Sequence, residues 1–306
     1  MRCSDGRVNM KAKKLKEPGQ VYLYIFIGIL ALLCILPFVI IFVASISDEA
    51  MITKNGFSLL PQNPGIDTYE FIVSKKGTML IRAFLVTITT VVAGTIYTVS
   101  MMTCYAYAIA QKKEKFRYAN ALSFFAWFTT VFGGGILPWY ILCTKYYGLQ
   151  NNLAALLIPY GMNVFFVFIL KNNFKAIPHE LLEAAEIDGA SNAGIFFKIA
   201  LPLAKVGIVT VLLFTVLQYW NDFHLSLYLI SSTELYTLQK LLYNLMANAS
   251  ALLTGVQGAV STEHVTVPTN TVRMAMTMIT VMPIMIVYPF AQKYFVRGMT
   301  IGAIKG

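Results

Sequence analysis

Residues 18–47, PGQVYLYIFIGILALLCILPFVIIFVASIS, form a long stretch without a single charged side chain. An α-helix rises about 1.5 Å per residue, so about 20 apolar residues cross the ~30 Å hydrocarbon core of a bilayer. The apolar region of a secretory signal peptide is shorter, at about 7–15 residues. We therefore expect residues 18–47 to form a membrane-spanning helix that is retained in the protein.

The same pattern recurs along the chain. Charged residues make up 12% of the sequence, about half of the roughly 25% that is typical of soluble domains. Backbone amides in lipid must be bonded within their own segment, which favours helices, and the alternation of barrel strands is absent. The sequence predicts an all-α membrane protein with six transmembrane helices. The further windows are residues 83–111, 118–144, 146–170, 206–229 (interrupted by Asp222) and 274–292.

The third window contains the run Gly133–Gly134–Gly135, and several windows contain proline. Neighbouring helices in a membrane bundle compensate for the backbone bonds that such residues disrupt, and small residues allow close approach. The triple glycine therefore has two open interpretations, close helix packing or a point of flexing.

Lys and Arg are distributed asymmetrically between the loops. Seventeen of them fall in the N-terminal segment, the loops after the second and fourth windows and the C-terminal tail, whereas five fall in the other loops. Positive charge accumulates on the cytoplasmic side of membrane proteins. We expect both termini to be cytoplasmic. The net charge of +10 is then explained by topology, and we expect no nucleic-acid partner.

The loop between the fourth and fifth windows carries the most informative sequence, IPHELLEAAEIDGASNAGIFFKIALP, residues 177–202. Acidic residues recur every third position at Glu180, Glu183 and Glu186 among good helix formers. Gly189 is a typical helix stop. The pattern predicts a helix, a glycine turn and a second helix that ends near Ile199, with Pro202 opening the next membrane segment.

This loop resembles the coupling loop of binding-protein-dependent ABC importer permeases. The family pattern is EAA, three residues, Gly, nine residues and Ile-x-Leu-Pro, and each position matches here. The resemblance implies that these residues bind the ATPase subunit, with Glu183 meeting a cationic residue and Gly189 forming the turn. The matching positions, with Asp188 before the glycine, are Glu183, Ala184, Ala185, Asp188, Gly189, Ile199, Leu201 and Pro202.

Three further stretches are similar to the sugar branch of that family, which includes MalG, and most of all to oligosaccharide permeases of the LplC and YtcP type. They are the triplet Trp220–Asn221–Asp222, the stretch GGGILPWY at residues 133–140, and YPFAQKYF with the tail that follows it, residues 288–306. The resemblance implies the type I ABC importer permease fold. The domain organisation expected from this resemblance is a cytoplasmic segment at 1–19, a permease domain at 20–297 and a cytoplasmic tail at 298–306. The coupling loop lies at 171–205 within the permease domain.

The resemblance also implies partners: a second permease chain in a heterodimer, two ATP-binding subunits, an extracytoplasmic solute-binding protein and an oligosaccharide substrate. The location would be the bacterial cytoplasmic membrane, with multiple passes. No GxxxxGK[ST] motif occurs, so ATP hydrolysis is expected on another chain. The three histidines are far apart and the four cysteines have no paired spacing. We therefore expect no enzyme activity, no cofactor and no metal.

Polar and aromatic residues within the windows are candidates for the substrate path. Gln218, Asn221 and Asp222 are spaced i, i+3 and i+4, which predicts one helical face in the outer half of the bilayer. Aromatic rings and amides suit sugars, but such groups also form helix–helix hydrogen bonds. Both roles stay open. The candidates are Trp127, Tyr140, Tyr160, Asn163, Gln218, Trp220, Asn221 and Asp222.

Other transport classes are alternatives. An importer of the same type could carry a non-sugar solute. An ion-coupled secondary transporter would have repeated halves and ionisable groups at the midplane, whereas Asp222 is the plainly intramembrane acid and no repeat is visible. A membrane-embedded enzyme would need a catalytic constellation that the sequence lacks.

Overall fold

The computed structural model describes residues 18–112, 114–253 and 269–303. Every regular element in these ranges is helical, which confirms the predicted all-α class. The longer helices are α1 (Pro18–Ser45), α3 (Asp67–Ala110), α4 (Ala119–Val131), α7 (Val164–Lys175), α11 (Lys205–Trp220), α13 (Leu238–Leu253) and α14 (Thr269–Ala303). The shorter ones are α2 (Glu49–Asn55), α5 (Ile136–Ile141), α6 (Ala154–Leu157), α8 (His179–Ile187), α9 (Asn192–Ile195), α10 (Leu201–Leu203) and α12 (His224–Leu229).

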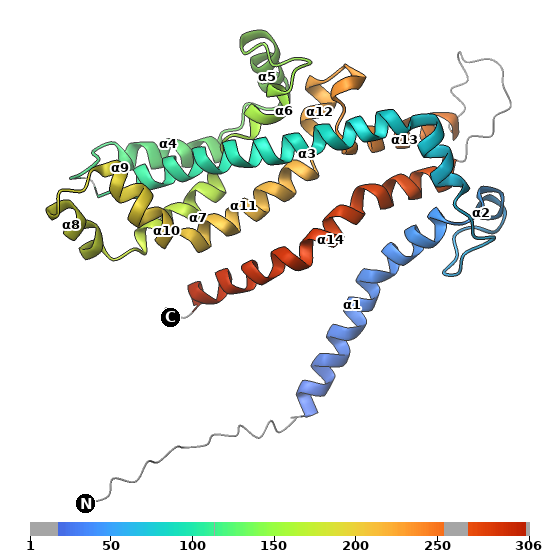
Figure 1. Cartoon of the computed structure of the whole chain (residues 1–306), viewed down its shortest axis with the longest axis horizontal. Helices are drawn as coiled ribbons and strands as arrows, with labels where there is room; N and C mark the ends of the chain where they lie inside the picture. The colour runs from blue at the N-terminus through green and yellow to red at the C-terminus, as the bar shows by residue number, and fades with distance from the viewer. Residues whose placement is uncertain (1–17, 113, 254–268, 304–306) are drawn as a thin grey trace, which may run out of the picture.

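Helix α3 is the axis of the molecule. It contacts α7 and α11 along one part of its length and α13 and α14 along another. As Figure 1 shows, α8 and α9 lie at one end of this axis, whereas α2 and α13 lie at the other, with α14 running beside α11. We call these the α8 end and the α13 end.

Each end has its own apolar core. At the α8 end, buried residues of α3 and α7 pack against Leu182, Ile195 and Phe196. At the α13 end, Leu238 and Leu241 pack against Val272 and Met276 of α14. A third cluster joins α5, α6 and α12. Both ends of α3 are therefore anchored, and loops at either end have a fixed support.

Two of the predicted windows, 118–144 and 146–170, are bent rather than straight, and a third bend lies just before the window at 206–229. The helices within 118–144 diverge by 116° between Val131 and Ile136, where the triple glycine lies and Gly135 has a φ of +79°. The segments before and after residues 161–163 differ by 55°, and those around Ala204 by 77°. An uninterrupted helix over 118–144 or 146–170 is therefore a wrong prediction. The length of an uncharged stretch shows that it can lie in a membrane, but it does not show where the helix axis changes direction.

The number of helices long and apolar enough to cross a membrane follows from these bends. Two qualify alone, within α1 and α3, and up to five if each bent pair is one span. Residues 270–286 of α14 form a shorter apolar helix. These counts cover only the described part of the chain. The predicted total of six membrane-spanning helices is larger than either count and stays a prediction.

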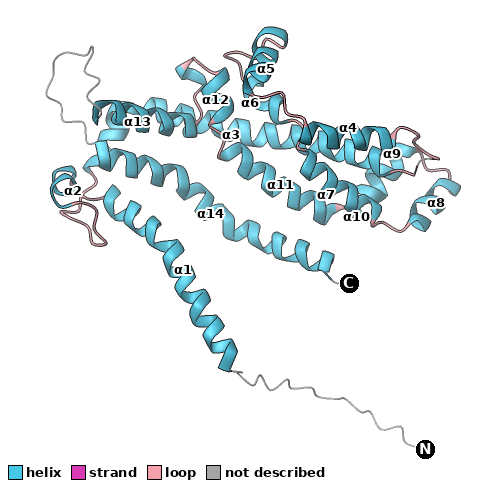
Figure 2. Ribbon diagram, turned by 180° about the vertical axis from the view of Figure 1, so that it is seen from behind, coloured by secondary structure: helices cyan, strands magenta, loops and turns pink. Residues whose placement is uncertain are grey.

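Helix α1 stands apart from the rest. Its side chains are exposed from Gln20 to Val39, and its contacts with α14 are the most extensive that it makes. The view from behind in Figure 2 shows the same separation between α1 and the bundle. Most of the predicted 1–19 segment and the last residues of the 298–306 tail lie outside the described residues.

Candidate functional sites at the two ends of the bundle

Helix α8 ends in a glycine turn, as the sequence predicts. Asp188 is the C-cap residue, and Gly189 follows it with a φ of +80°. The amide of Ala190 donates to the Ala185 carbonyl at 2.9 Å, and that of Gly189 to the Glu186 carbonyl at 3.0 Å. These two bonds define a Schellman motif, which requires a left-handed residue where glycine has no steric penalty.

Glycine is required at position 189 because of its left-handed backbone conformation, and not because a side chain would lack space. A Cβ atom added to Gly189 would meet no atom within 4 Å. After the turn, the side chain of Ser191 accepts a hydrogen bond from the Gly194 amide at 3.1 Å and so caps α9. The angle between the two helices is therefore set by the backbone turn at Gly189 and by the Ser191 cap.

Helix α8 has one anchored side and one free side. Leu182 is buried in the core of the α8 end, and Ala185 packs partly against it. Leu181 and Ile187 are exposed, the latter by 87%, and Ala184 and Asp188 are exposed with them. An anchored amphipathic helix with exposed apolar and acidic groups is a typical docking element.

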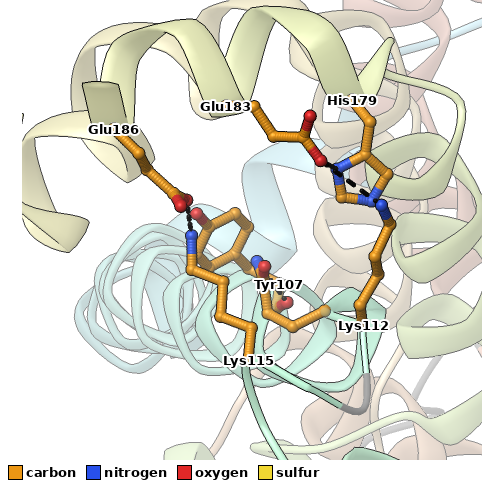
Figure 3. Close-up of polar contacts among 7 residues, drawn as sticks. Tyr107, Lys112, Lys115, His179, Glu183 and Glu186 are labelled. Atoms are coloured by element: carbon orange, nitrogen blue, oxygen red, sulfur yellow. Dashed lines mark hydrogen bonds and ion pairs between the residues drawn. The ribbon is translucent and has the colours of Figure 1, made fainter. Parts of the chain in front are cut away.

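Two lysines from the loop after α3 reach the acidic side chains of α8 (Figure 3). Lys112 Nζ lies 3.4 Å from Glu183 Oε1, and Lys115 forms an ion pair with Glu186. His179 Nδ1 is 4.0 Å from the same Glu183 oxygen. The Lys112 and Glu183 side chains are more than half exposed. Exposed pairs of this kind contribute about 0–1 kcal/mol and exchange partners readily.

Sequence reasoning missed these lysines as partners of Glu183 and Glu186, because they are 71 residues away in the chain. In the sequence analysis, these lysines contributed only to the prediction of the chain's orientation in the membrane. Their position in a basic loop on the same side of the membrane as the acidic helix was the signal that could have suggested the pairing.

A pocket of about 270 Å³ lies beneath α8. Its walls come from the end of α3, the end of α7 and the start of α8. The lining residues include Tyr107, Phe174 and Leu182, with Lys112, Lys175 and His179 as its ionisable groups.

The helix after the turn ends differently from the prediction. It continues through a π-helical segment, Phe196–Ala200, and α10 to Leu203, and the 77° bend follows at Ala204. Pro202 therefore lies before the bend and does not open the membrane segment. The tight turn at Ala204 starts α11 instead. Ile199 and Leu201 pack partly against the core, so the Ile-x-Leu pair joins the loop to the bundle.

The second polar site is at the C-terminal end of α11, after Trp220. Asp222 is buried, and its Oδ1 accepts a hydrogen bond of 2.6 Å from the Tyr160 hydroxyl. Its carboxylate also accepts from the Leu225 amide at 3.3 Å, near the start of α12. Asp222 thereby joins the turn after α11 to the segment between α6 and α7.

Tyr219, which the sequence analysis did not select, is the centre of this site. Its hydroxyl lies 2.8 Å from Thr98 Oγ1 and donates to the Leu157 carbonyl, also at 2.8 Å. Its ring lies against Gly94, where an added Cβ would be 2.6 Å from ring carbons. No spacing pattern in a single sequence identifies such a contact, because the partners come from three separate segments.

The predicted path residues separate into groups. Gln218, Asn221 and Asp222 do not share a helical face, because α11 ends at Trp220: Asn221 is exposed and Asp222 is buried. The Trp220 ring nitrogen donates to the Thr280 carbonyl of α14 at 3.3 Å. Asn163 caps α7, with its side chain accepting from the Phe165 amide at 3.1 Å.

Tyr140 and Tyr160 both pack against the apolar cluster of α5, α6 and α12. Trp127 lies on α4, half exposed, with Phe124 as its ring neighbour at 5.7 Å. The structure thus brings Tyr160 and Asp222 into contact and leaves Trp127 and Asn221 exposed. The contact between Tyr160 and Asp222 is a hydrogen bond between two segments of the bundle, which is one of the two roles considered for these residues.

Two cations at the α13 end were not singled out by the sequence. Lys240 of α13 is 6% exposed, and its Nζ donates to the Leu227 carbonyl at 3.4 Å. Its burial lowers the pKa of the ammonium group from the usual value. Arg273 of α14 has two buried side-chain nitrogens without a hydrogen-bond partner. Among the described residues, no cluster of potential metal ligands occurs.

Known proteins of similar sequence and structure agree with this architecture. Residues 8–301 match the family described as binding-protein-dependent transport system inner membrane component. The chain is 33% identical over 289 residues to the polygalacturonan/rhamnogalacturonan transport system permease protein YtcP of Bacillus subtilis, covering 94% of this chain and 98% of that protein. It is 34% identical over 298 residues to Protein LplC of the same organism, covering 97% of each.

A solved structure has the same fold. It belongs to a bacterial ABC transporter involved in the import of the acidic polysaccharide alginate, with a TM-score of 0.76 and 29% identity over 90% of this chain and 95% of that one. This likeness confirms the predicted type I ABC importer permease fold. From the family match and these relatives, the chain belongs to the inner membrane components of binding-protein-dependent ABC transport systems.

Proposed function

We propose that the chain forms half of the translocation path of an ABC importer for an oligosaccharide. The observation that carries this proposal is the α8 surface, an anchored acidic helix with a glycine turn at one end of a membrane bundle. The relatives named for polygalacturonan and alginate transport support a carbohydrate substrate.

The α8 surface gives a route for coupling. Leu181, Ile187 and the acidic side chains face outward and fit a groove of an ATPase subunit that carries apolar and basic groups. Docking would exchange the weak pairs with Lys112 and Lys115 for pairs with the ATPase. Because α9 and α10 lead directly into α11, a displacement of α8 is transmitted toward the polar site at the C-terminal end of α11.

The topology that fits this assignment has six spans and two cytoplasmic termini. The two bent spans within 118–146 and 154–175, together with α1, α3, α11 and α14, give that number, and the distribution of Lys and Arg supports the orientation. Cysteine labelling is expected to reach residues 48–78 and 231–270 from outside, and 111–117 and 171–205 only from inside. Labelling of 171–205 from outside would reverse the orientation and separate α8 from the ATPase.

The assembly that we propose contains a second, different permease chain, two ATP-binding subunits and a solute-binding protein. The direct test is co-expression followed by reconstitution in proteoliposomes, with ATP-dependent uptake of labelled oligosaccharides as the readout. We expect uptake to require every component. Uptake by this chain and the ATPase without the second permease would contradict the heterodimer. Uptake that an ion gradient drives without ATP would contradict the importer class.

A further inference from the structure

The α13 end carries an arginine whose charge is not balanced within the described residues. Nε and Nη2 of Arg273 are both buried and neither has a hydrogen-bond partner. The residue as a whole is partly exposed, so the guanidinium lies at the boundary between the core and an accessible surface. An unpaired charged group in such a position costs several kcal/mol, at about 1–3 for each unmade hydrogen bond.

Three described acids near this end have partners of their own. Glu49 accepts hydrogen bonds from the amides of Asn270 and Thr271 and so caps α14. Asp222 is bonded to Tyr160 and the Leu225 amide, and Glu234 pairs with Arg82 at the surface.

Lys240 is a second buried cation there, and it has a carbonyl rather than a carboxylate as its partner. Lys240 and Arg273 are therefore two cations at this end that form no ion pair with a described carboxylate.

The two unpaired atoms define the chemistry of the missing partner. The N–H groups on Nε and Nη2 of one guanidinium are parallel and match the two oxygens of a carboxylate. A neutral hydroxyl satisfies one of them at most. Nε and Nη2 themselves are buried, whereas Arg273 as a whole is partly exposed, so a carboxylate would reach this fork from the exposed side of the residue.

Arg273 lies on the same face of α14 as the residue that binds Trp220, whose aromatic ring could stack on a sugar. Arg273 and Thr280 are seven residues apart on α14, so they share a face about 10 Å apart along the helix. The Thr280 carbonyl accepts the hydrogen bond from the Trp220 ring, which places that face toward α11. A carbohydrate held near Trp220 can thus extend toward Arg273.

We propose that Arg273 binds a carboxylate of an acidic oligosaccharide, and that Lys240 strengthens the positive potential at this end of the path. This inference rests on the proposed function, since it names the substrate class of the same importer. It makes Arg273 a specificity-determining residue rather than a structural one.

The experiment uses the reconstituted complex and two probes, oligogalacturonate and the same oligomer with its carboxyl groups methyl-esterified. For Arg273→Gln we expect the KM for oligogalacturonate to rise about tenfold or more, equivalent to at least about 1.4 kcal/mol. The KM for the ester should not change. Arg273→Lys keeps the charge but loses the fork, so its KM should be intermediate. Arg82→Gln, an exposed cation at the same end, is the matched control and should affect neither probe.

The other outcomes are distinguishable. If both probes are impaired equally by Arg273→Gln, the arginine is structural and the proposal is wrong. If the variant chain fails to associate with the second permease on a sizing column, its partner is an acid of that chain, which also overturns the proposal. A wild-type complex that transports neutral oligosaccharides but not oligogalacturonate would overturn this inference alone. A complex that transports no oligosaccharide would overturn the proposed function itself.

Discussion

The two polar sites of this permease are built on opposite principles. At the α8 end, the acidic side chains pair with exposed lysines, and the backbone turn at Gly189 fixes the geometry. At the C-terminal end of α11, the buried side chains of Tyr219 and Asp222, with the partly buried Tyr160, fix the geometry through short hydrogen bonds. Water weakens the first kind of contact, whereas exclusion of water strengthens the second. The α8 surface is suited to exchanging partners, and the site at the end of α11 is suited to holding one arrangement.

The sharpest test of the buried site is Gly94→Ala. The added Cβ would lie 2.6 Å from the Tyr219 ring, which its hydroxyl bonds hold in place. We expect a loss of about 3 kcal/mol, the upper part of the range for overpacking, measured as a lower Tm of the purified protein. Gly77→Ala in the same helix is the control, because its Cβ would have an ordinary contact at 3.7 Å. If the two variants melt alike, the Tyr219 contact is not tight.

The Tyr160–Asp222 pair should come next in size. Tyr160→Phe leaves the buried Asp222 oxygen without its hydroxyl donor, for an expected loss of about 1–3 kcal/mol. A double-mutant cycle with Asp222→Asn would measure the coupling between the two side chains. Tyr140→Phe is the control, since the Tyr140 hydroxyl makes no hydrogen bond to the described residues. Additive single effects would show that the bond does not stabilise the bundle.

At the α8 end, Gly189→Val should destabilise the turn by about 1–2 kcal/mol, because a β-branched residue is strained at positive φ. Its effect on transport should be much larger. The protein should reach the membrane, but uptake should be abolished since α8 no longer fits the ATPase. Gly189→Asn should retain uptake, as asparagine tolerates the left-handed region better. Wild-type uptake by the valine variant would contradict a coupling role for this loop.

The smallest effect should come from the exposed pairs. Lys112→Gln in the free chain should change stability by about 0–1 kcal/mol, and less in high salt. Glu183→Ala should be equally mild in the free chain. In the assembled transporter it should cost about 2–5 kcal/mol of binding if its new cationic partner is desolvated. Binding of the ATPase subunits to each variant, measured at two salt concentrations, would distinguish the two situations. Equal affinity for wild type and Glu183→Ala would place this residue outside the interface.

The sequence predicted features that depend on residues close together in the chain, and it missed those that depend on residues far apart. The apolar windows predicted helices because lipid leaves a backbone few alternatives, and the Glu183–Gly189 spacing predicted a turn formed by nearby residues. The bends at 132–135 and 161–163 could not be predicted from uncharged sequence, since an apolar window is equally apolar when it turns. The Tyr160–Asp222 bond joins residues 62 apart, so it depends on the packing of α6, α11 and α12. That packing also decides why Asp222 is buried while Asn221 is not.

The isolation of α1 has a consequence for how the protein is made. Its side chains from Gln20 to Val39 are exposed, so its partition into the bilayer depends on its own composition. Leu, Ile, Phe and Val at the centre of a helix each favour insertion by about 0.3–0.6 kcal/mol. Because α1 precedes α2 to α14 in the chain, it can enter the membrane before these helices have been translated. They then join a segment that is already fixed in the bilayer.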